Sequence, residues 1–586
     1  MLTLEPSWNT SGLSEKNMDI ARAFCNEQLP YQWTVLEKEL LSRFVTNTNG
    51  RVALIHNLPS NVLAAIIARF SRLKNERGIR GCLIEFLAAF LQAVFNLPDS
   101  KEKNLNDVIT MAGIGRSLQM IKLVSADPDS LNQFANADRI KKLLDQFLTG
   151  YGHNSIARAG TACIIFEQVS ILAAERIVHG RAGSGYIEVS TRFVDMGRKS
   201  CYPIALELAL YGIKEEDIRI SDEMSFDYYK RWTDPKNPLQ AILWERFGGL
   251  FETEFGATAA ADHFQYGCFG DMCDLAGNFL PASTCTSVGV VASGEALQSL
   301  MKHLIGSGLS ECIALAESVI KEAEDTGIDQ FIRHFTPTQL EADGMRLYLP
   351  DHFECSDSEA LPWAELHGKH PQAIASEEAA LARQLSLALK QEEVCPSLHE
   401  LLEMRGCIGG KERGERRLTR PFELISLSFD GWISFRTYRD IHRHVVTNCM
   451  ERTYVTPDLR FFKDTKFSPD SEGLNNDFKI VHRANAILHA KMKVCGVPLT
   501  LAQYPLALGN GVAFTAGWNL RQQSFMEMQR TKHDVHPEAR SLVVSLSNQV
   551  RDRHAWWESV SLADMTPYYL FARAKKGGKH FPFPTP

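Results

Sequence analysis

A chain of 586 residues exceeds the size at which one hydrophobic core keeps growing, so its length predicts at least two domains. Its hydrophobic (45%) and charged (23%) fractions are those of a globular protein and exclude a disordered or fibrous chain. The net charge of -7 argues against general binding to polymeric nucleic acid or to a membrane surface, because both depend on clustered basic residues.

The first residues do not have the pattern of an export signal. Glu5 and Pro6 stand where a secretory signal needs basic residues and then an apolar run. The longest nearly uncharged stretch, residues 82–97, contains Glu85 and Gln92 and is shorter than the roughly 20 apolar residues that span a bilayer. We therefore expect a cytoplasmic protein without a membrane segment, whose scattered cysteines stay reduced.

Helical periodicity dominates the chain. Apolar residues repeat at three and four positions in residues 62–70, 140–148, 165–178, 297–323 and 377–389. Strand-like patterns are fewer and shorter, in residues 51–55, 284–291, 346–349 and 511–515. This mixture predicts an α+β fold.

A weak internal repeat divides the chain into two similar halves. Leu280-Pro281 in the first half and Tyr504-Pro505 in the second each lead into a short strand and then a long amphipathic helix. We expect two similar units, each with a central mixed or antiparallel sheet flanked by long helices. The expected segments are an N-terminal extension (1–45), a first domain (46–344), a second domain (345–565) and a loose C-terminal tail (566–586).

The first candidate site is a Glu-x-Ser-x-Arg run formed by Glu188, Ser190 and Arg192. The hydroxyl and the planar cation, two residues apart, suit a phosphate group or the edge of a nucleobase. Taken alone, such a run is more often a solvated surface. It is preceded by a Gly-His-x-Ser element with His153 and Ser155, which gives it a context.

The order of these motifs resembles the signature of the flavin-dependent thymidylate synthases. That family has an Arg-His-Arg element, a spacer and then Glu-x-Ser-x-Arg-Tyr. Here His179-Gly180-Arg181 and Arg443-His444-Val445 resemble the first element in the two halves. Near the start of the first half, Ala68-Arg69-Phe70-Ser71 matches the family's Ala-Arg-x-Ser.

The second half carries the family's C-terminal block. Trp518-Asn519-Leu520-Arg521, Met528-Gln529-Arg530 and His536-Pro537-Glu538-Ala539-Arg540 resemble its Asn-x-Arg, Leu-Arg and Glu-x-Arg elements. The resemblance covers roughly residues 50–335 as one copy and 345–560 as another.

The resemblance implies an FAD-dependent enzyme, reduced by NADPH, that passes a one-carbon unit from methylenetetrahydrofolate to the uracil C5 of dUMP. Arg530 would be catalytic, because a preplaced cation stabilises charge that develops on the ring. The residues implied to bind substrate are Glu188, Ser190, Arg192 and Arg158. The residues implied to bind the cofactor are Ser71, His153, Ser155, Arg181, Glu423, Arg443, His444, Asn519, Arg521 and His536.

The two halves depart from the family in complementary ways. The first half has Glu295 and Leu304 where the family has its C-terminal pair of arginines, and the second half has Thr453 and Val455 at the Ser and Arg positions. The family assembles its sites between the subunits of a homotetramer. We therefore expect a homodimer that forms a pseudo-tetramer with two competent and two inactive sites.

A further departure concerns the substrate. The family's phosphate-holding arginine before the Leu-Pro step is replaced by Gly277 and by Leu501, and Arg158 is a candidate substitute. Two alternatives to dUMP methylation therefore stay open. One is a flavoenzyme acting on a modified pyrimidine or a non-nucleotide, and the other is an inactive flavin-binding paralogue that acts as an interaction partner.

A metal site is not expected. His442, His444 and His482 have no clear carboxylate partner, and Cys268 and Cys273 lack the spacing and the second cluster of a zinc site.

Overall fold

A computed structural model gives the architecture of two compact units that interleave along the sequence. Unit 1 is formed by Met1–Arg219, Ala282–Met345 and Met492–Pro505, and unit 2 by Ile220–Pro281, Arg346–Lys491 and Leu506–Pro586. The residues that the structure describes are 13–58, 75–95, 110, 113, 115–117, 119, 161–178, 182–191, 194–197, 200–324, 326, 328–332, 363–386, 397–404, 407, 418–444, 449–457, 461–567, 569–572, 574–576, 579–580 and 583–584.

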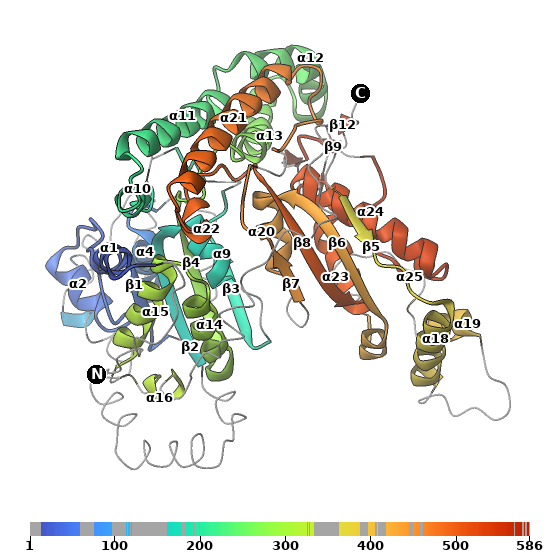
Figure 1. Cartoon of the computed structure of the whole chain (residues 1–586), viewed down its shortest axis with the longest axis horizontal. Helices are drawn as coiled ribbons and strands as arrows, with labels where there is room; N and C mark the ends of the chain where they lie inside the picture. Colours follow the sequence, from blue (N-terminus) through green and yellow to red (C-terminus); the bar gives the residue numbers. More distant parts are fainter. Residues whose placement is uncertain are drawn as a thin grey trace. The chain divides into compact units, whose positions relative to one another are not determined.

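Unit 1 is built on a four-stranded antiparallel sheet in the order β1-β2-β4-β3 (Figure 1). Its strands are β1 (Val52–Ile55), β2 (Thr161–Ser170), β3 (Ser184–Glu188) and β4 (Cys285–Ser293). Its helices are α1 (Glu15–Asn26), α2 (Val35–Leu41), α4 (Gly78–Val94), α9 (Ile171–Ile177), α10 (Ile204–Ala209), α14 (Gly294–Gly306), α15 (Ser310–Ala323), α16 (Asp329–Ile332) and α22 (Leu499–Ala502). Helix α15 packs on β1 and on α1, and α14 packs on β4. Helices α2 and α4 form a buried apolar cluster with residues of β1 and β2, so helices on both sides contribute to the core of this unit.

Unit 2 is built on a second four-stranded antiparallel sheet in the equivalent order β5-β6-β8-β7. Its strands are β5 (Trp363–Leu366), β6 (Ser426–Ser434), β7 (Cys449–Arg452) and β8 (Gly511–Asn519), with short pairs β9 (Tyr569–Leu570) with β12 (Phe583–Pro584) and β10 (Lys575–Lys576) with β11 (Lys579–His580). Its helices are α12 (Pro238–Phe255), α13 (Ala260–Ala276), α18 (Pro371–Ser386), α19 (Leu398–Met404), η3 (Arg420–Leu424), α20 (Phe435–His442), α23 (Leu520–Arg530), α24 (Pro537–Arg553) and α25 (Trp557–Val560). Helices α11 (Glu215–Thr233) and α21 (Glu472–Val494) each contain a boundary between the units.

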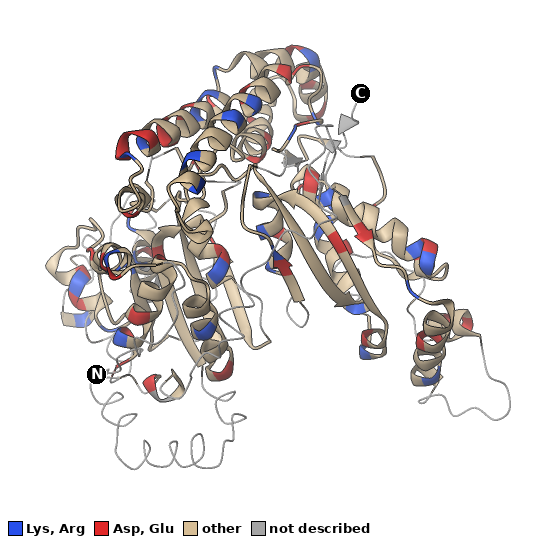
Figure 2. Cartoon of the chain, viewed as in Figure 1, with Lys and Arg blue, Asp and Glu red and all other residues tan. Residues whose placement is uncertain are grey.

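One central strand of each sheet is free of charged residues along its whole length. Strands β4 and β8 contain no Lys, Arg, Asp or Glu, whereas charges of both signs lie along α11 (Figure 2). This distribution fits strands that are covered by helices, because an unpaired charge is costly to bury. Across the described residues, no helix combines the length and the apolar character that crossing a membrane requires.

A buried serine and glutamate begin one helix in unit 1. Ser170 is the last residue of β2 and the N-cap of α9, where its hydroxyl accepts a hydrogen bond from the amide of Ala173. The Glu311 carboxylate, at the start of α15, accepts from the Ser170 amide (2.8 Å), the Ser170 hydroxyl (2.6 Å) and the Tyr504 hydroxyl (3.0 Å). Glu311 is fully buried, and burial raises its pKa to about 7.

Unit 2 repeats the serine–glutamate contacts of this arrangement at the start of α20. Ser434 ends β6 and caps the Thr437 amide, and the Glu538 carboxylate accepts from the Ser434 amide (2.7 Å) and hydroxyl (2.5 Å). The third donor to Glu538 is the Thr437 hydroxyl (2.7 Å), and burial again raises the pKa of the carboxyl. The shared strand order and the shared cap support the prediction of two similar units.

The α+β prediction is confirmed, with two antiparallel four-stranded sheets. The strands expected at 51–55, 284–291 and 511–515 and the helix expected at 377–389 correspond to β1, β4, β8 and α18. The segments 62–70, 140–148 and 346–349 lie outside the described residues.

Two helix predictions are wrong in detail. The 165–178 segment is a strand up to Ser170 and a helix only beyond it, because the serine cap starts a new element there. The 297–323 segment is two helices, α14 and α15, separated at Gly308, whose φ of +67° lies in the left-handed region that glycine adopts most readily.

The compact units differ from a simple split near residue 345, since Ile220–Pro281 folds with unit 2. The C-terminal segment is also anchored rather than loose at Phe571. The Phe571 side chain is fully buried, and its ring centroid lies 5.5 Å from that of Phe264. The backbone amide of Phe571 donates to the Asp271 carboxylate (3.0 Å).

Replacing the capping serine of unit 2 tests the role of this cap. Ser434→Ala removes the bond to the Thr437 amide and one of the donors to buried Glu538, so the free energy of unfolding in urea should fall by about 2–3 kcal/mol. Ser428→Ala, on an exposed position of the same strand, is the matched control and should change stability by less than about 0.5 kcal/mol. Equal stabilities for the two variants would show that the Ser434 cap does not stabilise unit 2.

Candidate functional site

Three segments of unit 2 that are distant in sequence bring together most of the predicted second-half residues. The segments are η3, the C-terminal end of α20, and α23 with its N-cap. The predicted residues that they contribute are Glu423, Arg443, His444, Asn519, Arg521 and Arg530. We call this set the arginine cluster.

Helix α23 positions two of the arginines on one element. Asn519 caps the helix by accepting a hydrogen bond from the Gln522 amide (2.9 Å), which fixes where the helix starts. Arg521 then lies in the first turn and Arg530 at the last position. The Gln522 side chain donates to the His444 carbonyl oxygen (2.8 Å), which ties the end of α20 to α23.

Arg530 is held by two acceptors from the end of α20. Its Nη2 donates to the Asp440 carbonyl oxygen (2.5 Å) and lies 2.5 Å from Nε2 of His444. The Phe525 ring packs edge-on against the His444 ring, with centroids 5.6 Å apart. These contacts fix the plane of the guanidinium group.

His444 is neutral at pH 7 in this environment. Burial lowers the pKa of its imidazole well below the usual 6.5, and the positive charges of Arg530 and Arg443 lower it further. A neutral ring offers Nε2 as an acceptor to the Arg530 guanidinium, which a protonated ring does not. The low pKa and the short contact are therefore consistent with one another.

Each of the other two guanidinium groups pairs with a carboxylate. Arg521 pairs with the Glu423 carboxylate (2.5 Å) and donates to the Leu418 carbonyl oxygen (3.0 Å), while 39% of its side chain stays exposed. Arg443 donates to the Arg439 carbonyl oxygen and lies 3.3 Å from an Asp440 carboxylate oxygen.

The donor set of the cluster fits an anionic group. The cluster and its neighbour Asp440 hold three guanidinium groups and two carboxylates, and the charges of Arg530 and Arg443 add to burial in lowering the pKa of His444. Guanidinium groups bind phosphate oxygens and carbonyl edges in two-point contacts. The pyrophosphate or the ring of a flavin, and a nucleotide phosphate, are ligands of this kind.

The equivalent helix of unit 1 lacks these arginines. Ser293 caps α14 as Asn519 caps α23, so the position two residues after the cap is Glu295 and the position eleven residues after it is Leu304. The helix register thus agrees with the pairing that the sequence indicates. Only unit 2 has the cations at these two positions.

The sheet register corrects the pairing of the other motif by one residue. The amide of Val189 donates to Ser287 and the amide of Thr453 to Ala513, and these acceptors hold the same place in β4 and β8. Thr453 is therefore the counterpart of Val189 and not of Ser190. By the same register the counterpart of Ser190 is Tyr454 and that of Arg192 is Thr456, so unit 2 still lacks the arginine.

Thr453 also has a structural role that the sequence does not reveal. Its side chain is buried and its hydroxyl accepts a hydrogen bond from the Ala513 amide (3.1 Å). Replacing Thr453 would therefore disturb the fold of unit 2 as well as any site nearby.

The space beside Gly277 is filled by an arginine from α20. A Cβ atom on residue 277 would lie 1.2 Å from Nη1 of Arg436. The Arg436 guanidinium is buried, donates to the Cys273 carbonyl oxygen (3.0 Å) and lies 3.9 Å from Asp274. The family's arginine at this position does not fit here.

Comparisons with known proteins relate the chain to proteins of similar extent. A UPF0159 protein of Chlamydia pneumoniae is 25% identical over 443 residues, which cover 70% of this chain and 73% of that protein. A UPF0159 protein of Chlamydia muridarum is 22% identical over 549 residues, covering 89% and 94% of the two chains. A UPF0159 protein of Thermoplasma acidophilum is 22% identical over 477 residues, covering 73% and 91%. No protein-family model matches the chain.

The remaining predicted residues lie elsewhere. His536 is the N-cap residue of α24, where its Nδ1 lies 3.3 Å from the Thr437 hydroxyl. Glu188 and Ser190 lie at the end of β3 and just beyond it in unit 1. The predicted residues outside the described part of the chain are Ser71, His153, Ser155, Arg158, Arg181 and Arg192.

Sequence reasoning missed two residues that shape the cluster. Asp440 supplies a carbonyl oxygen to Arg530 and a carboxylate to Arg443, and Gln522 links the two helices. Asp440 and Arg443 are three residues apart, a spacing at which opposite charges on a helix pair, so the sequence contained a signal for this contact.

The low pKa of His444 makes stability depend on pH in a definite direction. Below about pH 6.5 the unfolded chain binds a proton that the folded site resists, so this histidine lowers stability as the pH falls. Between pH 7 and 5, wild type should lose roughly 1 kcal/mol more in its free energy of unfolding than His444→Gln.

The control for this titration is His399→Gln, which alters an exposed histidine on α19. It should follow the wild-type pH profile. If His444→Gln also follows that profile, then His444 is not held neutral in the folded protein.

Proposed function

We propose that the chain is an FAD-dependent enzyme that catalyses reductive one-carbon transfer to C5 of a uracil nucleotide. The observation that carries the proposal is the arginine cluster, in which residues implied by the family resemblance lie together with a neutral histidine. By this proposal NADPH is the reductant and methylenetetrahydrofolate the carbon donor.

The three arginines of the cluster each have a task in this proposal. Arg443 and Arg521, which are both partly exposed, bind phosphate oxygens of the cofactor or substrate. Arg530, fixed by the Asp440 carbonyl oxygen and by His444, presents its guanidinium edge to a pyrimidine carbonyl and stabilises the negative charge that develops there. FAD, when bound, supplies the reducing equivalents.

A fixed cation is effective because it is arranged before the reaction begins. The Arg530 side chain is partly buried, so its field is less screened than that of a cation in water. Neutral His444 orients it without adding a competing positive charge. The active form is proposed to be a cytoplasmic homodimer, because the two units have lost complementary parts of the family's site.

One observation favours a second candidate, a flavoenzyme of the same type with a different substrate. Gly277 takes the place of the family's phosphate-holding arginine, and buried Arg436 occupies the adjacent space. A nucleotide phosphate must then be bound by other cations. Adding dUMP, UMP or dCMP together with methylenetetrahydrofolate to the reduced flavin distinguishes the two candidates, because the first predicts that a uracil nucleotide supports reoxidation of the flavin and the second does not.

Arg530→Lys tests the proposed catalytic role. Lysine keeps the charge but cannot donate through a planar fork to the Asp440 carbonyl oxygen, His444 and a substrate carbonyl together. Flavin binding should persist, while single-turnover oxidation of the reduced flavin by substrate should slow by about 10²- to 10³-fold.

The matched control is Arg246→Lys, which alters an exposed arginine of unit 2 that pairs with Asp470. Its turnover should equal that of wild type. Undiminished turnover in Arg530→Lys would contradict the proposed role. If wild type binds flavin but never turns over, the inactive-paralogue alternative gains instead.

A further inference from the structure

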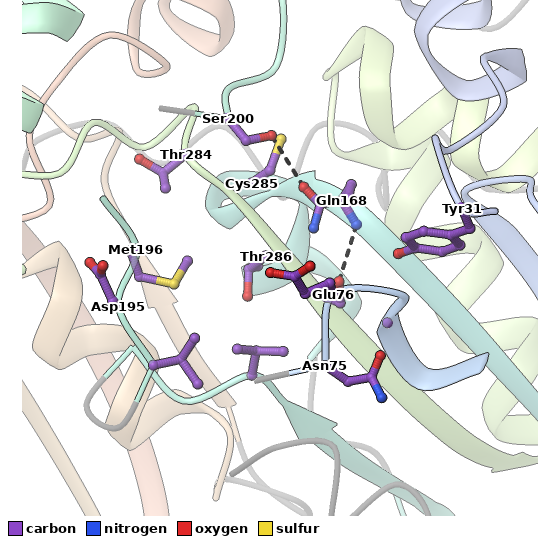
Figure 3. Close-up of a pocket in the computed structure, with 14 residues that line it drawn as sticks. Tyr31, Asn75, Glu76, Gln168, Asp195, Met196, Ser200, Thr284, Cys285 and Thr286 are labelled. Atoms are coloured by element: carbon purple, nitrogen blue, oxygen red, sulfur yellow. Dashed lines mark hydrogen bonds between the residues drawn. The ribbon is translucent and has the colours of Figure 1, made fainter. Parts of the chain in front are cut away.

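Unit 1 contains a cavity of about 110 Å³ at one end of its sheet, lined by both polar and apolar side chains that are distant in sequence from the arginine cluster (Figure 3). This volume has room for several water molecules and so for a small organic ligand. Residues at the start of β4, at the end of β2 and after β3 form its walls. Gly78 lets the chain approach closely here, because a Cβ at this position would lie 2.6 Å from the Tyr31 hydroxyl.

A buried hydroxyl in the cavity wall has no partner in the described part of the chain. Thr286 is 2% exposed and lines the cavity, yet its Oγ1 makes no hydrogen bond to any described residue. Leaving a buried hydroxyl without a partner costs free energy that a ligand atom would recover. This orphan group indicates that the cavity accepts a polar ligand.

A strained residue supplies a second polar group. Gln168 sits in a β-bulge at a φ of 55°, which is uncommon for a residue other than glycine. Three contacts hold it: its amide donates to the Ser287 hydroxyl (3.1 Å), its carbonyl oxygen accepts from Arg51 (2.8 Å), and its side chain accepts from the Ser200 hydroxyl (3.1 Å). Strain of this kind persists mainly at functional sites.

The bulge is a feature of unit 1 only. In unit 2 the equivalent strands β6 and β8 pair without interruption from Ser426 to Ser434. The bulge in β2 therefore places the Gln168 side chain at the cavity of unit 1. The continuously paired strands of unit 2 have no equivalent residue.

The chemistry of the walls defines the class of ligand. Hydroxyl groups of Thr284, Thr286 and Ser287 form one wall, and the carboxylates of Glu76 and Asp195 lie at exposed positions on the rim. None of the described lining residues is Lys or Arg. Carboxylates accept hydrogen bonds from hydroxyl groups and repel phosphate.

We propose that this cavity is a binding site for a small uncharged polyhydroxylated molecule of about the size of a pentose. Its hydroxyl groups donate to the rim carboxylates and to Thr286, while the apolar side chains of Val189 and Met196 pack against its carbon face. The site does not depend on the arginine cluster or on flavin.

The probe for the experiment is D-ribose, measured by saturation-transfer NMR with the full chain. Thr286→Val keeps the shape of the side chain and removes the orphan hydroxyl, so the Kd for ribose should rise about tenfold. Because no hydrogen bond is lost within the described protein, the unfolding temperature should stay equal or rise.

Ser283→Ala is a matched control, since Ser283 is fully buried, its hydroxyl likewise has no described partner, and it does not line the cavity. It should bind ribose as wild type does. The proposal is overturned if wild type shows no ribose signal or if Thr286→Val binds ribose equally well. If choline or inorganic phosphate binds more tightly than ribose, the proposal is also overturned. Loss of dUMP binding in Thr286→Val would overturn it too, because the cavity would then belong to the substrate site.

Discussion

Each of the two units depends on one buried interaction. A glutamate carboxylate accepts hydrogen bonds from the serine that ends a central strand and caps the next helix. Glu311 holds Ser170 and Glu538 holds Ser434 through the same pair of atoms, the amide and the hydroxyl. Each carboxylate stands at the start of a second helix, so a single residue fixes the strand, the helix that follows it and the helix that packs beside it. Since unsatisfied buried groups are costly, the arrangement leaves little freedom for the end of α20, from which the arginine cluster is built.

The arginine cluster combines rigidity with an excess of positive charge. Helix α23 begins at its Asn519 cap and ends at Arg530, so its length sets the distance between the first-turn and last-turn arginines. At the far end, His444 stays neutral because burial and the neighbouring guanidinium groups oppose its protonation. The site therefore offers a cation held by two acceptors, a neutral orienting group and two further cations that pair with carboxylates. This combination suits a ligand that carries both phosphates and a polarisable ring.

Sequence patterns predicted the parts of this structure that local spacing controls. The 511–515 strand and the complementary residues Glu295 and Leu304 follow from order and spacing alone, and the register of α14 and α23 agrees with them. The pairing of Ser190 with Thr453 was wrong by one position, because strand register depends on hydrogen bonds to a distant strand. The strand within 165–178 was missed since a buried strand and a buried helix are both continuous apolar runs. The filling of space beside Gly277 by Arg436 depends on tertiary packing, which no spacing in the sequence encodes.

The most direct test of the central claim is the absorption spectrum of the purified chain after incubation with FAD and gel filtration. The protein fraction should carry flavin, NADPH should bleach it under anaerobic conditions, and a uracil nucleotide with methylenetetrahydrofolate should restore the oxidised spectrum. A protein fraction that emerges without flavin would contradict the proposal that the chain binds FAD. The arginine cluster would then bind a different anion.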